Sequence, residues 1–424
     1  MLPAQKVRLR GAGNSTSASE SVVLTDTKSI PILRGVRVLD LTHVLAGPYA
    51  TMLLADLGAD VIKVEKPGRG DTTRGTPPFA GDLSHYFAAV NWGKRSVAID
   101  LKRSEGRALL LRLVERTDIV VDNFRPGTME ALDLGYDVLR GVNARIIRCT
   151  ISGFGQTGPL SKKPAFDAIV QAMSGFMAVT GERGGAPLRC GVSVGDVAAG
   201  AFAVAGIALA LYRREQTGVG QEIDVAMFDS LVSFMTYYLT LYQVSGEEPP
   251  RVGSEHASMV PLASYPTKDG YVVIAAFNDS FWKRMCEAIG HRELTVDARF
   301  QTVSDRQRNR DACNAALRAI FATRPTQEWV DLLESVDVPV SSILGIGALL
   351  AHPHLAARDL LRTLARPDAD LKVAGQPLKM SDHQNAGPPL GPPELGQDTR
   401  SILSSLLDVD EQEYQRLQGA GIVG

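Results

Sequence analysis

The 424-residue sequence predicts an α/β fold with a second, smaller α+β domain. Two observations support this prediction. A strand, a helix and another strand follow one another between Val36 and Val64, which is the pattern of a βαβ unit with parallel strands. Further short apolar runs alternate with helical stretches up to residue 226, and beyond the apolar helix at Phe228 to Tyr242 a hairpin and amphipathic helices replace that alternation.

Composition narrows the class of protein. A net charge of −2 gives no overall attraction to nucleic acid or to an anionic membrane, so neither partner is predicted. We expect no apolar run long enough to span a membrane. Cys149, Cys190, Cys286 and Cys313 are too scattered for a zinc motif and too few for a disulfide scaffold, which favours a reducing compartment. We therefore expect a cytoplasmic protein without a metal site.

Residues 1–30 carry Lys6, Arg8 and Arg10 and then a Ser/Thr-rich stretch, with no apolar segment that could serve as a secretory signal. We interpret this segment as a disordered arm. A mitochondrial transit peptide is the alternative, because basic residues come early and acidic residues are few before Glu20.

The first βαβ unit consists of a strand at Val36 to Leu41, a helix from Gly47-Pro48 through Leu57 and a strand at Val61 to Val64. A dinucleotide-binding domain would place G-x-G-x-x-G directly after the first strand. The turn from Thr42 to Pro48 contains only one glycine, so the sequence disfavours NAD binding.

Basic residues follow at or near the ends of strands and helices, at Lys66, Arg69, Lys94-Arg95 and Lys102-Arg103. Cations beside glycine-rich backbone suit a ligand with several phosphates, although any single one is more commonly a solvated surface charge. The strand Ile119 to Val121 leads into a polar and aromatic loop, and such carboxyl ends are where open α/β sheets bind ligands.

The strand Ile146 to Ile151 is followed by a glycine-rich loop at Gly153 to Pro159. Phe166-Asp167 then opens a helix, with Asp167 as its cap or as a functional acid.

Asp196 directly precedes a long Ala-rich helix that ends near Gln216, before a turn into the strand Glu222 to Val225. Free N–H groups and the helix dipole at such a position favour an ionised carboxylate. Asp196 therefore suits a helix cap and equally a nucleophilic carboxylate.

The second region begins with a hairpin, Leu262 to Tyr265 and Tyr271 to Ala276, and continues with a helix capped at Asn278 and helices at Asp305 to Ala322 and Thr326 to Ser335. From Val338 onward the chain is Pro-rich, and we expect loops there. His352 and His354 have no acidic or cysteine partner at ligand spacing, so we interpret them as loop residues.

Several blocks of the sequence resemble, in order, those of the class III CoA-transferases, the formyl-CoA transferase family. The resemblance covers nearly the whole chain after residue 30. The blocks are Val38 to Thr42, Ala46 to Pro48, Asp56 to Glu65, Asn123 to Gly127, Ser152 to Pro159, Gly195-Asp196, Thr217 to Gln221 and Trp329 to Pro339.

The resemblance implies that Asp196 is the catalytic nucleophile. In this family the aspartate attacks an acyl-CoA to give a mixed anhydride, and exchange proceeds through an aspartyl-CoA thioester. CoA thioesters and a small carboxylic acid are then the substrates, and no permanently bound cofactor is expected. An ionised carboxylate can act as such a nucleophile, and Gly191 and Gly195 leave room for a thioester to approach.

The resemblance also implies the residues that contact CoA, with Lys66 and Lys102 facing its phosphates. They are Val44, Ala46, Lys66, Ile99, Lys102, Asn123, Phe124 and Arg125.

The family fold implies a Rossmann-like large domain built from both chain ends, a smaller α+β domain and an interlocked homodimer. The expected boundaries are residues 1–30 for the arm, 31–226 for the large domain, 227–337 for the small domain with its linker, and 338–424 for a linker and the return to the large domain.

The sequence also departs from its relatives. Leu45 replaces the glutamine of formyl-CoA transferases, and Gly253 to Ser258 replaces their glycine-rich loop, so formate and oxalate are disfavoured. Phe166 stands where 2-methylacyl-CoA racemases need a histidine base, which disfavours racemisation. The segments Gly253 to Pro261 and Pro77 to Phe79 are most similar to succinyl-CoA:dicarboxylate (glutarate-type) transferases.

We therefore expect CoA transfer from succinyl-CoA or another dicarboxyl-CoA to a carboxylic acid. The candidate substrate residues are Phe166, Asp167, Arg189, Gly253 and His256, with Arg189 or His256 paired with a distal carboxylate. A racemase-type isomerase and a non-catalytic CoA-binding protein are the alternatives. The family's arginine near residue 131, lysine near 164 and histidine near 398 are absent, so those contacts are expected to differ.

Overall fold

A computed structural model describes residues 31–364, 370–381 and 391–424; the predicted arm at 1–30 lies outside them. Its centre is a six-stranded parallel sheet in the order β5-β2-β1-β6-β7-β8. The strands are β1 (Arg37–Asp40), β2 (Asp60–Glu65), β5 (Arg95–Ala98), β6 (Ile119–Asp122), β7 (Ile147–Ser152) and β8 (Glu222–Ala226). The predicted α/β fold with a parallel sheet is thus confirmed. The strand order reverses between β1 and β6, and ligands bind at such a point in doubly wound sheets.

The two faces of the sheet are covered by different helices because alternate residues of each strand point to opposite sides. Val38 packs with α1 (Ala46–Asp56), α6 (Asp167–Met173), α7 (Val194–Thr217) and α8 (Met227–Phe234). Leu39 packs on the other face with α3 (Ser104–Val114), α5 (Tyr136–Val142), α17 (Thr399–Leu407) and α18 (Glu411–Gly419). Both faces of the sheet are therefore buried.

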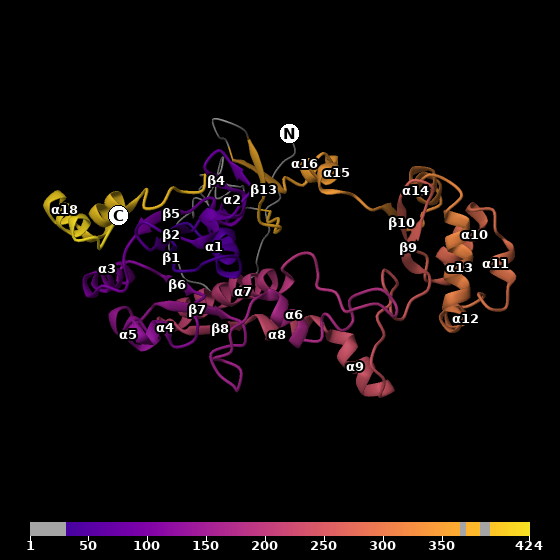
Figure 1. Cartoon of the computed structure of the whole chain (residues 1–424), viewed down its shortest axis with the longest axis horizontal. Coiled ribbons are helices and arrows are strands. Elements are labelled where there is room, and N and C mark those ends of the chain that lie inside the picture. The colour runs from indigo at the N-terminus through magenta and orange to yellow at the C-terminus, as the bar shows by residue number, and fades with distance from the viewer. Residues whose placement is uncertain (1–30, 365–369, 382–390) are drawn as a thin grey trace, which may run out of the picture.

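The last residues of the chain pack beside the sheet (Figure 1). Ile99 forms a bridge with Val423, and the carboxylate of Asp398 accepts a hydrogen bond of 2.9 Å from the N–H of Ser96. The expectation of loops after Val338 is wrong, because short strands and helices occur there as well as α17 and α18, and His354 lies in one of the short helices. The apolar residues of α17 and α18 are few and follow a Pro-rich run, and that run led to the prediction of loops.

The smaller sheet is antiparallel, in the order β11-β10-β9. It consists of β9 (Leu262–Pro266), β10 (Tyr271–Ala275) and β11 (Val340–Ser342), so the predicted hairpin is confirmed and the sheet extends past residue 337. Packed around it are α10 (Asp279–Ala288), α11 (Glu293–Val296), α12 (Val303–Arg308), α13 (Arg310–Phe321) and α14 (Thr326–Glu334). The Asn278 side chain caps α10 as predicted, whereas the predicted helix at 305–322 is interrupted at Asn309.

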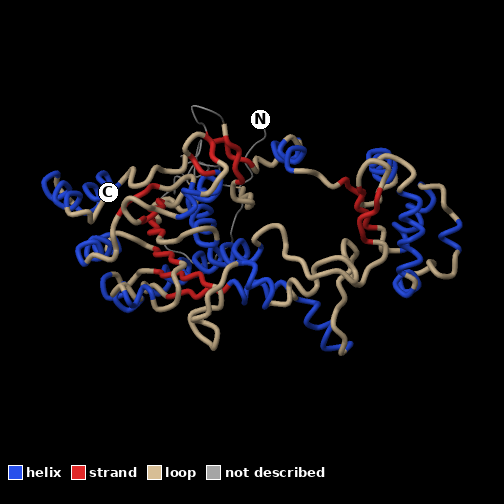
Figure 2. Tube along the Cα trace, in the orientation of Figure 1, coloured by secondary structure: helices blue, strands red, loops and turns tan. Residues whose placement is uncertain are grey.

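Segments on two sides connect this sheet to the large one (Figure 2). One connection includes α9 (Thr236–Ser245), which Met235 separates from α8 and whose first residue, Thr236, has a φ of 22°, so the apolar helix predicted at 228–242 is two helices. The other includes α15 (Ile346–Leu350), α16 (Pro353–Ala357), β12 (Leu361–Leu364) and β13 (Leu371–Ala374). The remaining short elements are the 3-10 helix Thr72–Gly75, β3 (Phe79–Ala80), β4 (Leu83–Ser84), α2 (His85–Asn91) and α4 (Thr128–Ala131).

Helix α7 is long and apolar enough to cross a membrane by length and composition, and it is the one such helix within the described residues. The expectation that no run reaches that length is therefore wrong. One side of α7, including Ala199, Ala203 and Ile207, is buried against the large sheet, as in the core helix of a globular domain. Its other side exposes Phe202, Leu209 and Tyr212.

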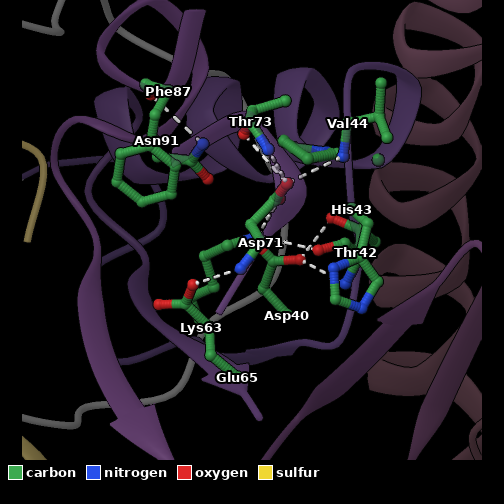
Figure 3. A network of polar contacts seen from close by, with 12 residues as sticks. Asp40, Thr42, His43, Val44, Lys63, Glu65, Asp71, Thr73, Phe87 and Asn91 are labelled. Atoms are coloured by element: carbon green, nitrogen blue, oxygen red, sulfur yellow. Dashed lines mark hydrogen bonds and ion pairs between the residues drawn. The ribbon is translucent and has the colours of Figure 1, made fainter. Parts of the chain in front are cut away.

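Two buried ion pairs lie near the carboxyl end of β1, and Figure 3 shows Asp40, Lys63 and Asp71 from them. Lys94 Nζ is 2.8 Å from Asp40 Oδ2, and Lys63 Nζ is 3.1 Å from Asp71 Oδ2, with all four side chains fully buried. Burial alone would raise the pKa of Asp40, but Lys94 and Lys63 outweigh it and hold that pKa below its usual range. Asp40 is therefore an ionised carboxylate inside the core.

Replacing Lys94 by methionine leaves the Asp40 carboxylate buried without its cation. We expect this change to lower the free energy of unfolding by about 3–5 kcal/mol, measured by urea denaturation. The double variant Asp40→Asn/Lys94→Met removes both charges and should recover most of that loss. A double variant as unstable as the single one would contradict this account.

Candidate active site

Loops after β1 and β6 meet where the strand order reverses. The N–H of His43 donates to Asn123 Oδ1 at 2.9 Å, and Asn123 Nδ2 donates to the carbonyl oxygen of His43 at 2.7 Å. The His43 ring packs against Phe124 with centroids 5.7 Å apart. These contacts fix both loops at the carboxyl edge of the sheet.

Val44 has a φ of 69°, a left-handed conformation that is rare for a β-branched residue and costs about 1–3 kcal/mol. The buried charges hold the loop in place. Lys63 Nζ donates to the carbonyl oxygen of Thr42 at 2.7 Å, and Asp71 accepts from the N–H of Val44 at 3.4 Å (Figure 3). The ion pairs in the core therefore set the backbone of the predicted CoA site.

A cavity of about 720 Å³ opens at the carboxyl ends of β2, β5 and β6. It is lined by five of the predicted CoA residues, Lys66, Ile99, Lys102, Phe124 and Arg125. Lys162, which the sequence analysis did not select, also lines it. Four cations around one partly apolar cavity suit a ligand that carries both phosphates and an apolar portion.

A second cavity, of about 190 Å³, contains Asp196 in its wall. Val44, Ala46 and Asn123, the other three predicted CoA residues, line it as well. His43 lines both cavities, so they adjoin at this residue. The rest of the lining of the smaller cavity is formed by Leu45, Ile151, Ser152, Gly153, Ala165, Phe166 and Met227.

Asp196 lies in the first turn of α7 rather than before it. The helix begins at Val194, and Ser193 occupies the cap position, so the predicted cap at Asp196 is wrong. The N–H of Ala46, at the start of α1, donates a hydrogen bond to the Asp196 carboxylate. The two helix starts thus meet at the carboxylate.

The Asp196 carboxylate is harder to ionise than an ordinary one. Burial and then the negative charge of Asp167 raise its pKa from 3.8 to about 7, against the lowering effect of the Ala46 hydrogen bond. The expectation that the helix start favours the ionised form is therefore wrong, because desolvation and a like charge outweigh the dipole.

Asp167 does not cap its own helix, contrary to one of its two predicted roles. Phe166 occupies the cap position of α6 without a side-chain bond; the residue is 76% exposed and lines the smaller cavity. The buried Asp167 carboxylate instead accepts from the N–H of Gly195 at 2.8 Å and from Gln171 Nε2 at 2.7 Å.

Of the predicted substrate residues, Asp167, Arg189, Gly253 and His256 line neither cavity. Arg189 donates from its guanidinium to the carbonyl oxygens of Cys190 and Gly191. His256 Nδ1 accepts from the N–H groups of Ser258 and Met259, and Gly253 has a φ of 63° beside Glu182. His256 and Gly253 thus have local structural contacts.

His43 and Lys162 were missed by sequence reasoning. His43 stands between Thr42 and Val44, in a loop that the resemblance already assigned to the CoA site. The residues beside His43 were therefore the indication in the sequence that it belongs to the site. Lys162 stands two residues before Pro164, so the expectation that no lysine lies near that position is wrong. Among the described residues, no group of three or more His, Cys, Asp or Glu side chains is placed to hold a metal ion.

Residues 33–399 match the family model for CoA-transferase family III. The chain belongs to this family. It is 42% identical over 362 residues to acetyl-CoA:oxalate CoA-transferase of Acetobacter aceti, covering 85% of this chain and 92% of that protein. It is 38% identical over 403 residues to succinyl-CoA:glutarate CoA-transferase of Mus musculus, and this match covers 94% of this chain and 92% of that protein.

A crystal structure of a CAIB/BAIF family protein from Brucella suis matches the fold of this CoA-transferase with a TM-score of 0.79. The two chains are 34% identical, and the match covers 88% of this chain and 99% of the other. The α/β architecture with a parallel central sheet is therefore that of the family.

The raised pKa of Asp196 predicts a pH-dependent gain in stability for Asp196→Asn. The folded enzyme holds a proton that the unfolded chain loses near pH 3.8, so the stability of the wild type falls as pH rises toward 7. Asparagine does not titrate and can still accept from Ala46. We expect the variant to melt about 2–4 °C higher than wild type at pH 8, with a smaller gain at pH 5. A gain that is equal at both pH values, measured by calorimetry, would contradict the assignment.

Proposed function

We propose that this enzyme transfers CoA from succinyl-CoA or another dicarboxyl-CoA to a second carboxylic acid, with Asp196 as the nucleophile. The observation that carries the proposal is the position of Asp196 in a small cavity that adjoins a larger, cation-lined cavity at His43. A long thioester with a phosphorylated end fits this pair of cavities. The names of the relatives support the reaction class.

In the proposed complex, Lys66, Lys102, Arg125 and Lys162 face the phosphates of CoA. The cations are exposed at the rim of the larger cavity, where they can exchange water for phosphate oxygens. The pantetheine arm then passes His43 and brings the thioester to Asp196. Val44, Ala46 and Asn123 line that end of the path.

The reaction balances without a net proton or an external reductant. An Asp196 oxygen attacks the thioester carbonyl carbon, the C–S bond breaks, and CoA thiolate leaves a mixed anhydride. The thiolate attacks the Asp196 acyl carbon and releases the donor acid, which gives an aspartyl-CoA thioester. The acceptor carboxylate displaces the thiolate to form a second anhydride. Attack of the thiolate on the acceptor acyl carbon then gives the new acyl-CoA and restores Asp196.

The N–H of Ala46 supports these steps. It already donates to the Asp196 carboxylate, and the same donor can follow the oxygen as negative charge develops on it in each tetrahedral intermediate. Its position at the start of α1 adds the positive end of a helix dipole.

A dicarboxylic acceptor carries a second, distal carboxylate that the enzyme has to hold. No lysine or arginine is among the described residues that line the smaller cavity, so a distal carboxylate needs a cation from elsewhere. Arg189, in the loop before α7, is one candidate, and His256 is the other. A screen should include glutarate and also oxalate, because one relative is named for oxalate although Leu45 argues against it.

We also propose a homodimer in the cytoplasm. The exposed side of α7, with Phe202, Leu209 and Tyr212, offers an apolar face that a second copy would cover.

Incubation with succinyl-CoA without acceptor should label Asp196 covalently. We expect intact-protein mass spectrometry to detect an adduct that hydroxylamine removes and that maps to Asp196. Asp196→Ala should show no adduct and lose at least about 1000-fold in turnover. Asp229→Ala is the matched control, since Asp229 occupies the same third position of α8 and is exposed. No adduct despite CoA binding would favour a binding protein, and labelling of Asp196→Ala would place the nucleophile at another residue.

Lys102→Ala should raise KM for succinyl-CoA about 10-fold with little change in kcat, because a charge-assisted contact to phosphate is lost. The KM for succinyl-pantetheine, which lacks the phosphates, should not change. Lys283→Ala, an exposed lysine of the smaller domain, is the control. Equal effects on both thioesters would place Lys102 outside the phosphate site.

A further inference from the structure

We propose that Asp167 is a positioning residue that holds a fixed negative charge beside Asp196 and thereby makes Asp196 a more basic nucleophile that is more readily acylated. The inference rests on the proposed role of Asp196 as nucleophile. It gives Asp167 a role distinct from contact with the substrate.

The two carboxylates are linked through a single residue, Gly195. Asp167 opens α6 and accepts from the N–H of Gly195 at 2.8 Å, and Gly195 directly precedes Asp196. A Cβ on residue 195 would lie 3.1 Å from Asp167 Oδ1, so glycine permits this close approach. The start of α7 is therefore held against the Asp167 carboxylate.

The contacts of Asp167 are those of an ionised group. Both of its partners are N–H donors, from Gly195 and Gln171, and its place in the first turn of α6 adds the favourable end of a helix dipole. Gln171 also accepts from the N–H of Cys190 at 2.8 Å, which ties the loop before α7 to the same point. Asp167 is only 6% exposed, so water screens its charge poorly.

The groups that face Asp196 do not neutralise this charge. Tyr86, from α2, has a pKa raised by burial and then by Asp196, Asp71 and Asp167. His43, from the loop after β1, has a pKa lowered mainly by burial, so it is neutral at pH 7. Within the described part of the chain, Asp167 is the one charged group that shifts the pKa of Asp196, which rises to about 7 through burial first and this charge second.

Acylation removes the repulsion between the two carboxylates. Asp196 is negative before it attacks and becomes a neutral acyl group in both the anhydride and the thioester. The charge of Asp167 therefore destabilises the ionised starting state relative to either intermediate. A more basic carboxylate is also a stronger nucleophile toward the thioester carbon.

The test compares Asp167→Asn with Gln171→Leu. The measured quantity is the rate of covalent labelling of Asp196 by succinyl-CoA in a single turnover, as a function of pH. Wild type should show an acidic limb with a midpoint near 7. Asp167→Asn keeps the shape of the side chain but removes its charge. In this variant the midpoint of the pH profile should fall by about one pH unit, and the labelling rate on the high-pH plateau should fall by about 10-fold.

Gln171→Leu removes a hydrogen bond but keeps the charge, so its midpoint should stay at the wild-type value whatever its rate. A purely structural role for Asp167 would lower the rate of Asp167→Asn without moving the midpoint, and that result would overturn the proposal. Asp167→Ser, a smaller acceptor for Gly195, provides the same comparison if the asparagine variant does not fold. Absence of labelling in wild type would count against Asp196 as nucleophile instead.

Discussion

The arrangement of this CoA-transferase site depends on charges buried at the carboxyl edge of the sheet. Lys63 and Lys94 lie inside the core, where each needs a carboxylate partner because an unpaired buried cation is costly. Asp71 and Asp40 meet that need from a following loop and from the end of β1. Lys63 also bonds to the backbone of the loop that begins at Thr42. The position of the loop is thus a consequence of satisfying these charges.

The same edge of the molecule holds carboxylates in two opposite environments. Asp40 and Asp71 face lysines, which keep the pKa of each carboxyl low despite burial. Asp196 faces another carboxylate and one backbone N–H, and its pKa is high. Paired charges fix the backbone of the site, while Asp196 has no cationic partner among the described residues. A stable framework with a single destabilised group is the arrangement expected where strain or unfavourable charge serves chemistry.

The sequence predicted those features of the structure that depend on residues close together in the chain. Periodicity and turn residues predicted the strands around β1 and β2, the hairpin of the small sheet and the cap at Asn278. Asp196 was selected correctly as a residue of the cavity wall, yet its environment was misjudged, because burial and the charge of Asp167 arise from another helix. His43 gave no signal of its own, since only folding brings the β1 and β6 loops together. Helices α17 and α18 were missed because their apolar residues match a face of the sheet formed some 300 residues earlier.

The pairing of Ile99 with Val423 has a consequence for how the chain is made. Ile99 lines the larger cavity, and its backbone neighbour Asp100 donates to the carbonyl oxygen of Ile422 at 2.8 Å. A ribosome releases the N-terminal βαβ unit long before these last residues exist. The edge strand β5 and the apolar face beneath it must therefore stay incomplete until residues 422 and 423 have been made. A nascent chain stalled before helices α17 and α18 would present an exposed sheet face to chaperones.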